Sequence, residues 1–165
     1  MDYRELGRTG LEVSVLGMGT GGLDPLGIKS GRSEAEMRHL LKHAFDLGIT
    51  LFDTSPVYGA GRSERILGEA LRDLPRQEVV VATKISLAAS MPGKPIQIMP
   101  PQRIRGCVEA SLARLQLETV ELLLMAVAGP QHLETVLNDQ LPELRLLKRE
   151  GKIRFIGTSE LTRLD

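Results

Sequence analysis

Short runs of apolar residues alternate along the chain with longer stretches in which apolar residues recur every three or four positions. The runs indicate strands, and the recurring spacing indicates amphipathic helices. Most of the runs are continuously apolar, which is typical of parallel strands covered on both faces. They lie at residues 15–16, 49–52, 79–82, 122–127 and 153–156, after an opening hairpin at residues 3–14. The alternation predicts a parallel α/β sheet with right-handed crossovers.

Helix-boundary signals support this order. Ser33 and Glu36 have the spacing of a capping box, so a helix is expected to begin just after Ser33. Ser63 is the expected cap of a second helix. Pro142 is expected to divide or kink a later helix, since proline lacks the amide proton that the helix ladder needs. The later helices are predicted over residues 101–117 and 132–150.

Two long segments, residues 23–32 and 86–100, do not fit this scheme and together are rich in glycine, proline and methionine. Each follows a predicted strand, and in α/β proteins the loops at that end of the strands hold ligands. Two interpretations stay open: the segments form walls of a pocket, or they are mobile insertions.

Composition narrows the range of partners. The chain has 165 residues, and its 21 Lys and Arg balance its 21 Asp and Glu. A neutral chain lacks the basic field that would draw it to nucleic acid or to an anionic membrane, so neither partner is expected. No apolar run approaches the roughly 20 residues of a membrane helix, and the first residues lack the apolar core of a signal peptide. We therefore expect a cytoplasmic protein.

Metal and disulfide sites are not expected. Cys107 is the single cysteine of the sequence, which excludes an intramolecular disulfide. His39 and His43 stand one helical turn apart, but no third ligand is apparent near them. A solvated helix face explains this pair better than a metal site.

The glycine-rich residues 17–22 match the pattern G-x-G-x-x-G of a dinucleotide-binding turn. That turn requires a helix that begins at the glycines, so that its N-terminus faces the pyrophosphate. Here the next helix is predicted to begin only near Ser33, which argues against the dinucleotide interpretation. A close approach of the backbone, to a ligand or to neighbouring chain, explains the glycines better.

A stronger set of residues lies at the ends of two predicted strands. Asp53 directly follows residues 49–52, Tyr58 comes shortly after it, and Lys84 closes the run that begins at Val79. Each alone has an ordinary structural explanation, but the carboxyl ends of parallel strands meet at one edge of a sheet, so we expect the three to converge. Asp53 would then supply the partner that a lysine in a buried strand requires. The ammonium fixed in this way would make a nearby phenol a stronger acid, suited to proton donation at neutral pH.

Six motifs occur in order along the chain: YRELGRTGLEVS at residues 3–14, GMGTGG at 17–22, FDTSPVYG at 52–59, SERILGEAL at 63–71, ATK at 82–84 and GKIRFIGTS at 151–159. With these motifs the sequence resembles the aldo-keto reductase family over its whole length. The resemblance implies a (β/α)₈ TIM barrel that uses NADPH, seldom NADH, to reduce small aldehydes and ketones.

The resemblance also implies roles for individual residues. Asp53, Tyr58 and Lys84 match three members of the catalytic tetrad of the family. Tyr58 would protonate the carbonyl oxygen while hydride leaves the nicotinamide, and Lys84 and Asp53 would tune it. The cofactor-binding positions fall on Gly19, Thr20, Asp53 and Ser159, of which Ser159 would hold the nicotinamide carboxamide.

Two positions depart from the family pattern. Ala126 replaces the tetrad histidine and offers no hydrogen bond to a substrate. The loss of such a positioned group can cost ~10² to 10⁴-fold in rate. His132 lies further along the chain and is expected in the next helix rather than in that place. Glu160 follows Ser159 where the family usually has asparagine, so a carboxylate stands where an amide would help to hold the nicotinamide.

The chain is also shorter than a complete barrel. Eight βα units take about 250 residues, whereas five strands are predicted here. We therefore expect residues 1–165 to be the N-terminal portion of a single, longer barrel domain, and the isolated chain to bind the cofactor poorly and to be inactive. The alternative is a natural half-barrel that pairs its edge strands with a second copy or with a partner chain.

Two functions stay open at this stage. Tyr58 and Lys84 favour an NADP-dependent oxidoreductase that acts on aldehydes or ketones. Ala126 and Glu160 favour a non-catalytic relative, either a scaffold or a cofactor-sensing subunit.

Overall fold

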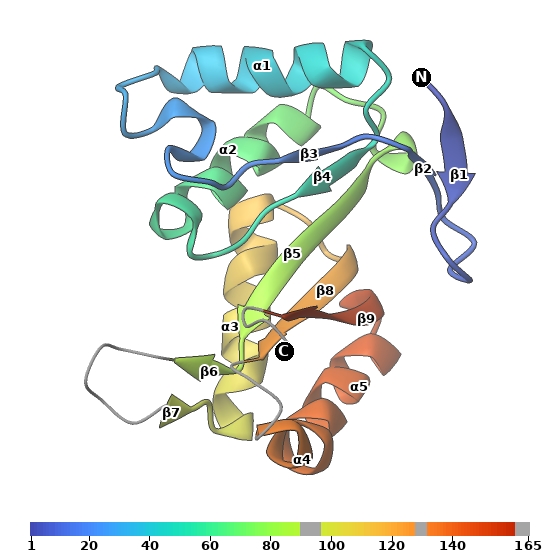
Figure 1. Cartoon of the computed structure of the whole chain (residues 1–165), viewed down its shortest axis with the longest axis vertical. Coiled ribbons are helices and arrows are strands. Elements are labelled where there is room, and N and C mark those ends of the chain that lie inside the picture. Colours follow the sequence, from blue (N-terminus) through green and yellow to red (C-terminus); the bar gives the residue numbers. More distant parts are fainter. Residues whose placement is uncertain (90–96, 128–131, 161–165) are drawn as a thin grey trace.

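The computed structural model describes residues 1–89, 97–127 and 132–160. A five-stranded sheet runs through the molecule, with the helices packed on one side of it (Figure 1). Its strands lie side by side in the order β3 (Gly17–Gly19), β4 (Leu51–Asp53), β5 (Val80–Ser86), β8 (Val120–Val127) and β9 (Ile153–Glu160). All four neighbouring pairs are parallel, which confirms the predicted parallel α/β sheet.

Helices fill the connections between these strands. They are α1 (Glu34–Asp46), α2 (Arg62–Leu71), α3 (Pro101–Leu115), α4 (Leu133–Thr135) and α5 (Leu141–Arg149). Between α4 and α5 the chain forms a π-helical turn, Val136–Gln140, and Pro142 lies in the first turn of α5. The predicted division of this helix is confirmed, because proline has no amide proton with which to continue a regular ladder.

The hydrophobic core lies between the sheet and the helix layer. Side chains alternate along a strand, so Val81, Ile85 and Leu123 point toward the helices, where they are buried. The helices contribute fully buried side chains to the same core: Met37, Leu41, Ile66, Leu67, Ile104, Leu115, Leu144 and Leu147. Each such side chain contributes roughly 1.5–3 kcal/mol to folding. The other face of the sheet carries a smaller apolar cluster, to which Val80, Leu122 and Phe155 contribute, and the Asp53 and Lys84 side chains.

The predicted opening hairpin is also present. Its strands β1 (Tyr3–Glu5) and β2 (Glu12–Ser14) pair antiparallel, close to the end of the sheet at which the strands begin (Figure 1). Leu11 and Val13 pack there against Val80, the first residue of β5. The hairpin therefore lies at the amino ends of the strands, away from the carboxyl ends at which a site is expected.

The position predicted for the first strand is wrong. The strand lies at Gly17–Gly19 rather than at residues 15–16, where Val15 and Leu16 are 47% and 61% exposed. The glycines allow this strand to approach β4 closely, since a Cβ on Gly17 would lie 3.3 Å from the Leu51 side chain. Backbone pairing, rather than apolar side chains, decides where this strand forms.

The prediction that Ser63 caps the second helix is also wrong. Gly61, with a φ of 85°, is the N-cap residue of α2, and the helix begins at Arg62. The Ser63 side chain is buried and donates to the Thr20 carbonyl oxygen at 3.1 Å. A serine near a helix start can bond to another segment as readily as to its own helix, and the sequence does not show which.

The two long segments have different structures. Residues 23–32 contain the 3₁₀ turn Pro25–Gly27, and the tip of Ile28 lies against Gly59. Within residues 86–100, two short strands pair antiparallel, β6 (Ala88–Ala89) and β7 (Gln97–Ile98). Within residues 86–100, the interpretation as a mobile insertion concerns residues 90–96, which lie outside the described ranges.

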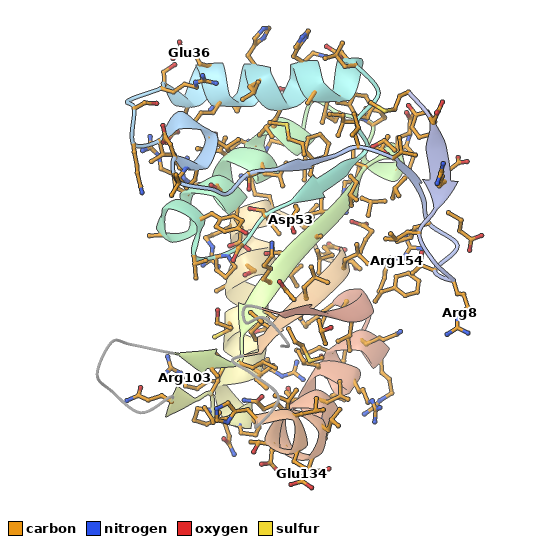
Figure 2. The ribbon with its side chains drawn as sticks, in the orientation of Figure 1. Arg8, Glu36, Asp53, Arg103, Glu134 and Arg154 are labelled. Carbon is orange, nitrogen blue, oxygen red and sulfur yellow. The ribbon has the colours of Figure 1, made fainter. Side chains whose placement is uncertain are left out.

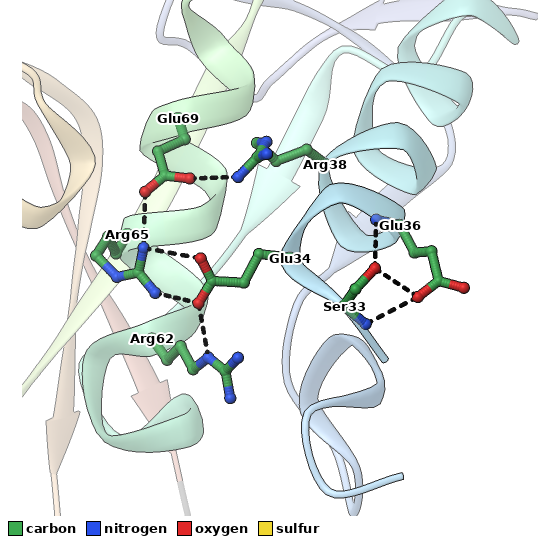
Figure 3. A network of polar contacts seen from close by, with 7 residues as sticks. All are labelled: Ser33, Glu34, Glu36, Arg38, Arg62, Arg65 and Glu69. Atoms are coloured by element: carbon green, nitrogen blue, oxygen red, sulfur yellow. Dashed lines mark hydrogen bonds and ion pairs between the residues drawn. The ribbon is translucent and has the colours of Figure 1, made fainter. Parts of the chain in front are cut away.

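The predicted capping box at the start of α1 is confirmed (Figure 3). The Glu36 amide donates to Ser33 Oγ at 3.3 Å, and the Ser33 amide donates to Glu36 Oε2 at 2.8 Å. Amides at the start of a helix have no partner within the helix, so these two bonds determine where α1 begins.

Ion pairs connect α1 to α2 (Figure 3). Glu34 accepts hydrogen bonds from Arg65 and, at 3.1 Å, from Arg62 Nε. Arg65 also donates to Glu69 at 2.7 Å, and Arg38 donates to the other oxygen of that carboxylate at 2.7 Å. The network spans both helices and adds polar contacts to their apolar packing.

A second ionic group is buried between the helices and the sheet. Glu64 on α2 is fully buried, and it accepts from Thr83 Oγ1 at 2.6 Å and from Arg114 Nε at 2.7 Å. A buried carboxylate is tolerated only when it is paired in this way. The sequence carried a signal for it, because Glu64 has helical spacing from Leu67 and Leu71 on the buried face of α2. The three residues join α2, β5 and α3.

Five parallel strands form part of a barrel, because closure of this architecture takes eight. The two strands at the edges of the sheet in the described ranges are β3 and β9. None of the described helices has both the length and the apolar composition that crossing a bilayer requires.

We expect Glu34→Gln to lower the stability of the protein at pH 7 but not at acid pH. The hydrogen bond from Arg65 lowers the pKa of the Glu34 carboxyl below its ordinary value. A lowered pKa adds stability above about pH 4.3, and that contribution is lost as the pH falls through the lowered value. Urea midpoints of the variant and the wild type should therefore differ at neutral pH and converge once the pH lies below the lowered pKa of Glu34.

The control for this measurement is Glu134→Gln, at an exposed residue on the opposite end of the molecule from α1 (Figure 2). A Glu34→Gln effect of equal size at both pH values would contradict an origin in the carboxylate charge.

Replacement of Glu64 tests the buried pair. Glu64→Ala leaves Thr83 and Arg114 without their acceptor, and we expect the free energy of unfolding to fall by about 3 kcal/mol. Glu64→Gln retains an acceptor and the side-chain volume, so it should lose less. Chemical denaturation of both variants measures the difference. Equal losses would show that the carboxylate charge, which both variants remove, accounts for the whole effect, and would contradict a contribution from the retained acceptor.

Candidate active site

Three acceptors hold the Lys84 side chain at the carboxyl end of the sheet. Its Nζ lies 2.6 Å from each carboxylate oxygen of Asp53 and 3.1 Å from the carbonyl oxygen of Thr54. An ammonium group has three protons to donate, so this set occupies all of them. The Lys84 side chain is only 15% exposed, and its charge therefore requires the carboxylate.

Strand register explains why these two side chains meet. β4 pairs with β5 so that Asp53 stands opposite Ala82, two residues before Lys84. The side chains of residues two apart in a strand point to the same face of the sheet. The side chains of two residues that pair across neighbouring parallel strands also point to the same face. Asp53 and Lys84 consequently lie on the same face of the sheet, and Asp53 is seen between β4 and β5 (Figure 2).

Tyr58 lies beside this ion pair. It begins the 3₁₀ turn Tyr58–Gly61, which follows β4, and its ring centroid is 5.0 Å from Lys84 Nζ. That distance is within the range of a cation–π interaction. Gly59 and Ala60 adopt φ values of 58° and 54°, and this tight turn leads directly into α2. The convergence predicted for the three residues is thus observed.

The glycine-rich segment makes room for the Tyr58 ring. A Cβ on Gly21 would lie 2.5 Å from the ring Cζ, closer than two such atoms can approach. This is the close approach that the glycines predicted, and the neighbour is a side chain of the site. The absence of a side chain at residue 21 therefore positions the phenol.

Buried hydroxyl groups connect the glycine-rich segment to the end of β4. Thr20 and Thr54 are fully buried, and Thr20 Oγ1 donates to Thr54 Oγ1 at 2.8 Å. The Thr20 amide donates to the Asp53 carbonyl oxygen at 2.8 Å, and Ser63 supports the Thr20 carbonyl from α2. Gly19 stands opposite Asp53 in the β3–β4 pairing. Of the predicted cofactor positions, Gly19 and Thr20 thus adjoin Asp53.

Three small side chains form a row at the ends of β5, β8 and β9. Ser86 stands opposite Ala126, and Ala126 stands opposite Ser159. All three share the face of Lys84, because Ser86 lies two residues beyond it in the same strand. Ser159, on β9, is the member of this row that lies furthest from Asp53, because β5 and β8 lie between β9 and β4. Ala126 is buried, and its methyl group offers no hydrogen bond.

One prediction for the site falls outside the described part of the chain, because it concerns the Glu160 side chain, whose placement is not described. His132 lies at the start of α4, as expected, rather than in the row of small side chains.

A cavity of about 240 Å³ lies between β5 and α3, on the helix side of the sheet. Ile85 and Leu123, which face the helices, line it together with residues of α3 such as Val108 and Ser111. Ser86 and Met99, from residues 86–100, are also among its lining residues, so this segment contributes to a pocket wall, but not on the face that carries the Lys84 side chain. No sequence motif marks Ser86 as a site residue, and the available signal was its position two residues after Lys84.

Comparison with known proteins agrees with the fold. The sequence model of the Aldo/keto reductase family matches residues 15–164. The chain is 38% identical over 162 residues to "Probable aldo-keto reductase 1" of Glycine max, a match that covers 94% of this chain and 44% of that protein. It is 38% identical over 164 residues to the L-galactose dehydrogenase of Arabidopsis thaliana, covering 98% and 49% respectively. The chain spans about half the length of the curated relatives it matches.

Solved structures agree as well. An aldo-keto reductase from Bacillus halodurans, in its holo form, gives a TM-score of 0.78 at 28% identity over 98% of this chain and 51% of that one. The glycerol dehydrogenase of Gluconobacter oxydans gives 0.72 at 32% identity over 98% and 49%. These neighbours are (β/α)₈ barrels, so the five-stranded sheet corresponds to part of such a barrel, as expected. The family model covers most of the sequence, and the chain accordingly belongs to the aldo/keto reductase family.

Proposed function

We propose that the protein containing this chain is an NADP-dependent oxidoreductase that reduces small aldehydes or ketones. The observation that carries the proposal is the Lys84 ammonium, 2.6 Å from Asp53 and 5.0 Å from the Tyr58 ring centroid. Membership of the family supports a nicotinamide cofactor, with NADPH preferred to NADH. The names of two relatives, L-galactose dehydrogenase and glycerol dehydrogenase, fit a small carbonyl compound or its alcohol.

In this proposal Tyr58 is the general acid. Its phenol donates a proton to the carbonyl oxygen of the substrate as the bound nicotinamide supplies hydride to the carbonyl carbon. Negative charge then appears on the phenol oxygen, and the nearby Lys84 ammonium stabilises it. Asp53 accepts two hydrogen bonds from Lys84 and keeps that cation in place.

We assign the wall of the cofactor site to Gly19, Thr20, Asp53 and Ser159. A Cβ on Gly19 would meet no atom within 4 Å, so there is open space beside Asp53 for a flat ring. The Thr20 hydroxyl is already bonded to Thr54, and its contribution is to hold the wall in shape. The Ser159 hydroxyl has no partner within residues 1–89, 97–127 and 132–160, which leaves it able to bond to an amide.

A non-catalytic relative, either a scaffold or a cofactor-sensing subunit, is the second candidate. This candidate is favoured by Ala126, which lies in the row of small side chains next to Lys84 and has no polar group with which to bind a substrate. We propose residues 1–165 as the N-terminal portion of a single barrel domain, so both candidates are to be tested on the full-length protein. Cofactor binding without NADPH consumption on any of a panel of aldehydes would favour the second candidate.

Tyr58→Phe in the full-length protein should lower kcat for aldehyde reduction by at least about 100-fold, because the variant cannot donate the proton. Its affinity for NADPH, measured by fluorescence titration, should not change. Tyr3→Phe is the matched control, since it removes the hydroxyl of the other tyrosine, which lies in the hairpin and donates to the Gly48 carbonyl oxygen. Full activity of Tyr58→Phe would refute the assignment of the general acid.

Gly21→Ala tests the position of the phenol without altering it chemically. The added Cβ would overlap the Tyr58 ring, so the ring must shift, and a shift of about 1 Å can cost about 100-fold in rate. Gly106→Ala is the control, because a Cβ there meets nothing within 4 Å. Activity and thermal stability should be measured for both variants. Wild-type activity of Gly21→Ala would show that the ring position seen here is not required.

A further inference from the structure

Ser86 occupies a place in the site that no other residue on its strand could serve. It lies one step beyond Lys84 on the same face of β5 and stands opposite Ala126. Neighbouring strands are about 4.8 Å apart, so a molecule held over the Ala126 methyl group is within reach of the Ser86 hydroxyl. Ala126 itself has no side chain beyond Cβ, so it supplies no polar group that would compete with Ser86 for that molecule.

The hydroxyl is both accessible and uncommitted. Ser86 is half-buried, so it is not enclosed by its neighbours. Within the described ranges no hydrogen bond is made by its Oγ. A serine hydroxyl in such a place can donate one hydrogen bond to a carbonyl oxygen.

The backbone around Ser86 is firmly held. The Leu87 amide donates to the Ala126 carbonyl oxygen at 3.2 Å. The fully buried Gln140 donates through Nε2 to the carbonyl oxygens of Leu87, at 3.2 Å, and Met99, at 2.7 Å. A donor on a fixed strand end stabilises developing charge better than one on a loose loop, since little reorganisation is needed during the reaction.

We propose that the Ser86 hydroxyl donates a hydrogen bond to the carbonyl oxygen of the substrate, as a second donor beside the Tyr58 phenol. This inference rests on the proposed reductase function. Ser86 thereby orients the carbonyl group and stabilises the negative charge that grows on its oxygen when hydride is added. Ser159, the other hydroxyl of the row, is left for the nicotinamide. The site thus retains two donors to the carbonyl oxygen although position 126 has none.

The test is steady-state reduction of benzaldehyde and glyceraldehyde with NADPH by the full-length protein. Ser86→Ala should lower kcat/KM about 10- to 100-fold, the effect of losing one hydrogen bond to an oxygen that becomes charged. The affinity for NADPH should not change. Ser86→Thr retains the hydroxyl and should retain most of the rate. Adding a histidine in the double variant Ser86→Ala/Ala126→His should restore part of it.

Thr158→Ala is the matched control, because Thr158 is an exposed hydroxyl residue next to Ser159 that points to the opposite face of β9. A rate for Ser86→Ala within a factor of about two of wild type, alongside an inactive Tyr58→Phe, would overturn the role of Ser86 and leave the reductase function intact. Absence of turnover in the wild-type protein with either aldehyde would overturn both. A loss of NADPH affinity in Ser86→Ala would overturn the role in substrate binding and assign Ser86 to the cofactor.

Discussion

The charge of a largely buried ammonium group is the constraint on which the site depends. Lys84 is 15% exposed, and its three donors are occupied by the Asp53 carboxylate and the Thr54 carbonyl oxygen. These acceptors come from the end of β4, so β4 and β5 must keep their register. A slip of one residue would turn Lys84 toward the helix layer and away from the Asp53 carboxylate.

The same strand connects the site to the stability of the fold. Thr83, next to Lys84, faces the helices and donates to the buried Glu64 of α2, which also binds Arg114 of α3. α2 begins directly after the turn that carries Tyr58. Helix α2 therefore contacts the face of β5 that points to the helices, and it also fixes the turn that carries Tyr58 on the other side of β5. The packing of α2 consequently sets the distance between the Lys84 amine and the Tyr58 phenol.

Much of the site could be predicted from the sequence because each residue is tied to a local pattern. Asp53 and Lys84 end continuous apolar runs, and parallel strands place such ends at one edge of a sheet. The glycine-rich segment indicated a close approach but not its neighbour, the Tyr58 ring. Ser63 carried a valid capping signal, yet a carbonyl group distant in sequence took its hydroxyl instead. Short-range signals do not rank a local partner against a distant one.

The sequence by itself determined the order of strands and helices, the start of α1, the break at Pro142 and the candidate trio, because each depends on residues close together in the chain. Tertiary structure decided the pairing of Glu64, the true position of the first strand and the row in which Ser86 stands beside Ala126. Those features depend on which side chains from separate segments are brought within bonding distance. Strand register and packing, which no short stretch of sequence contains, determine that outcome.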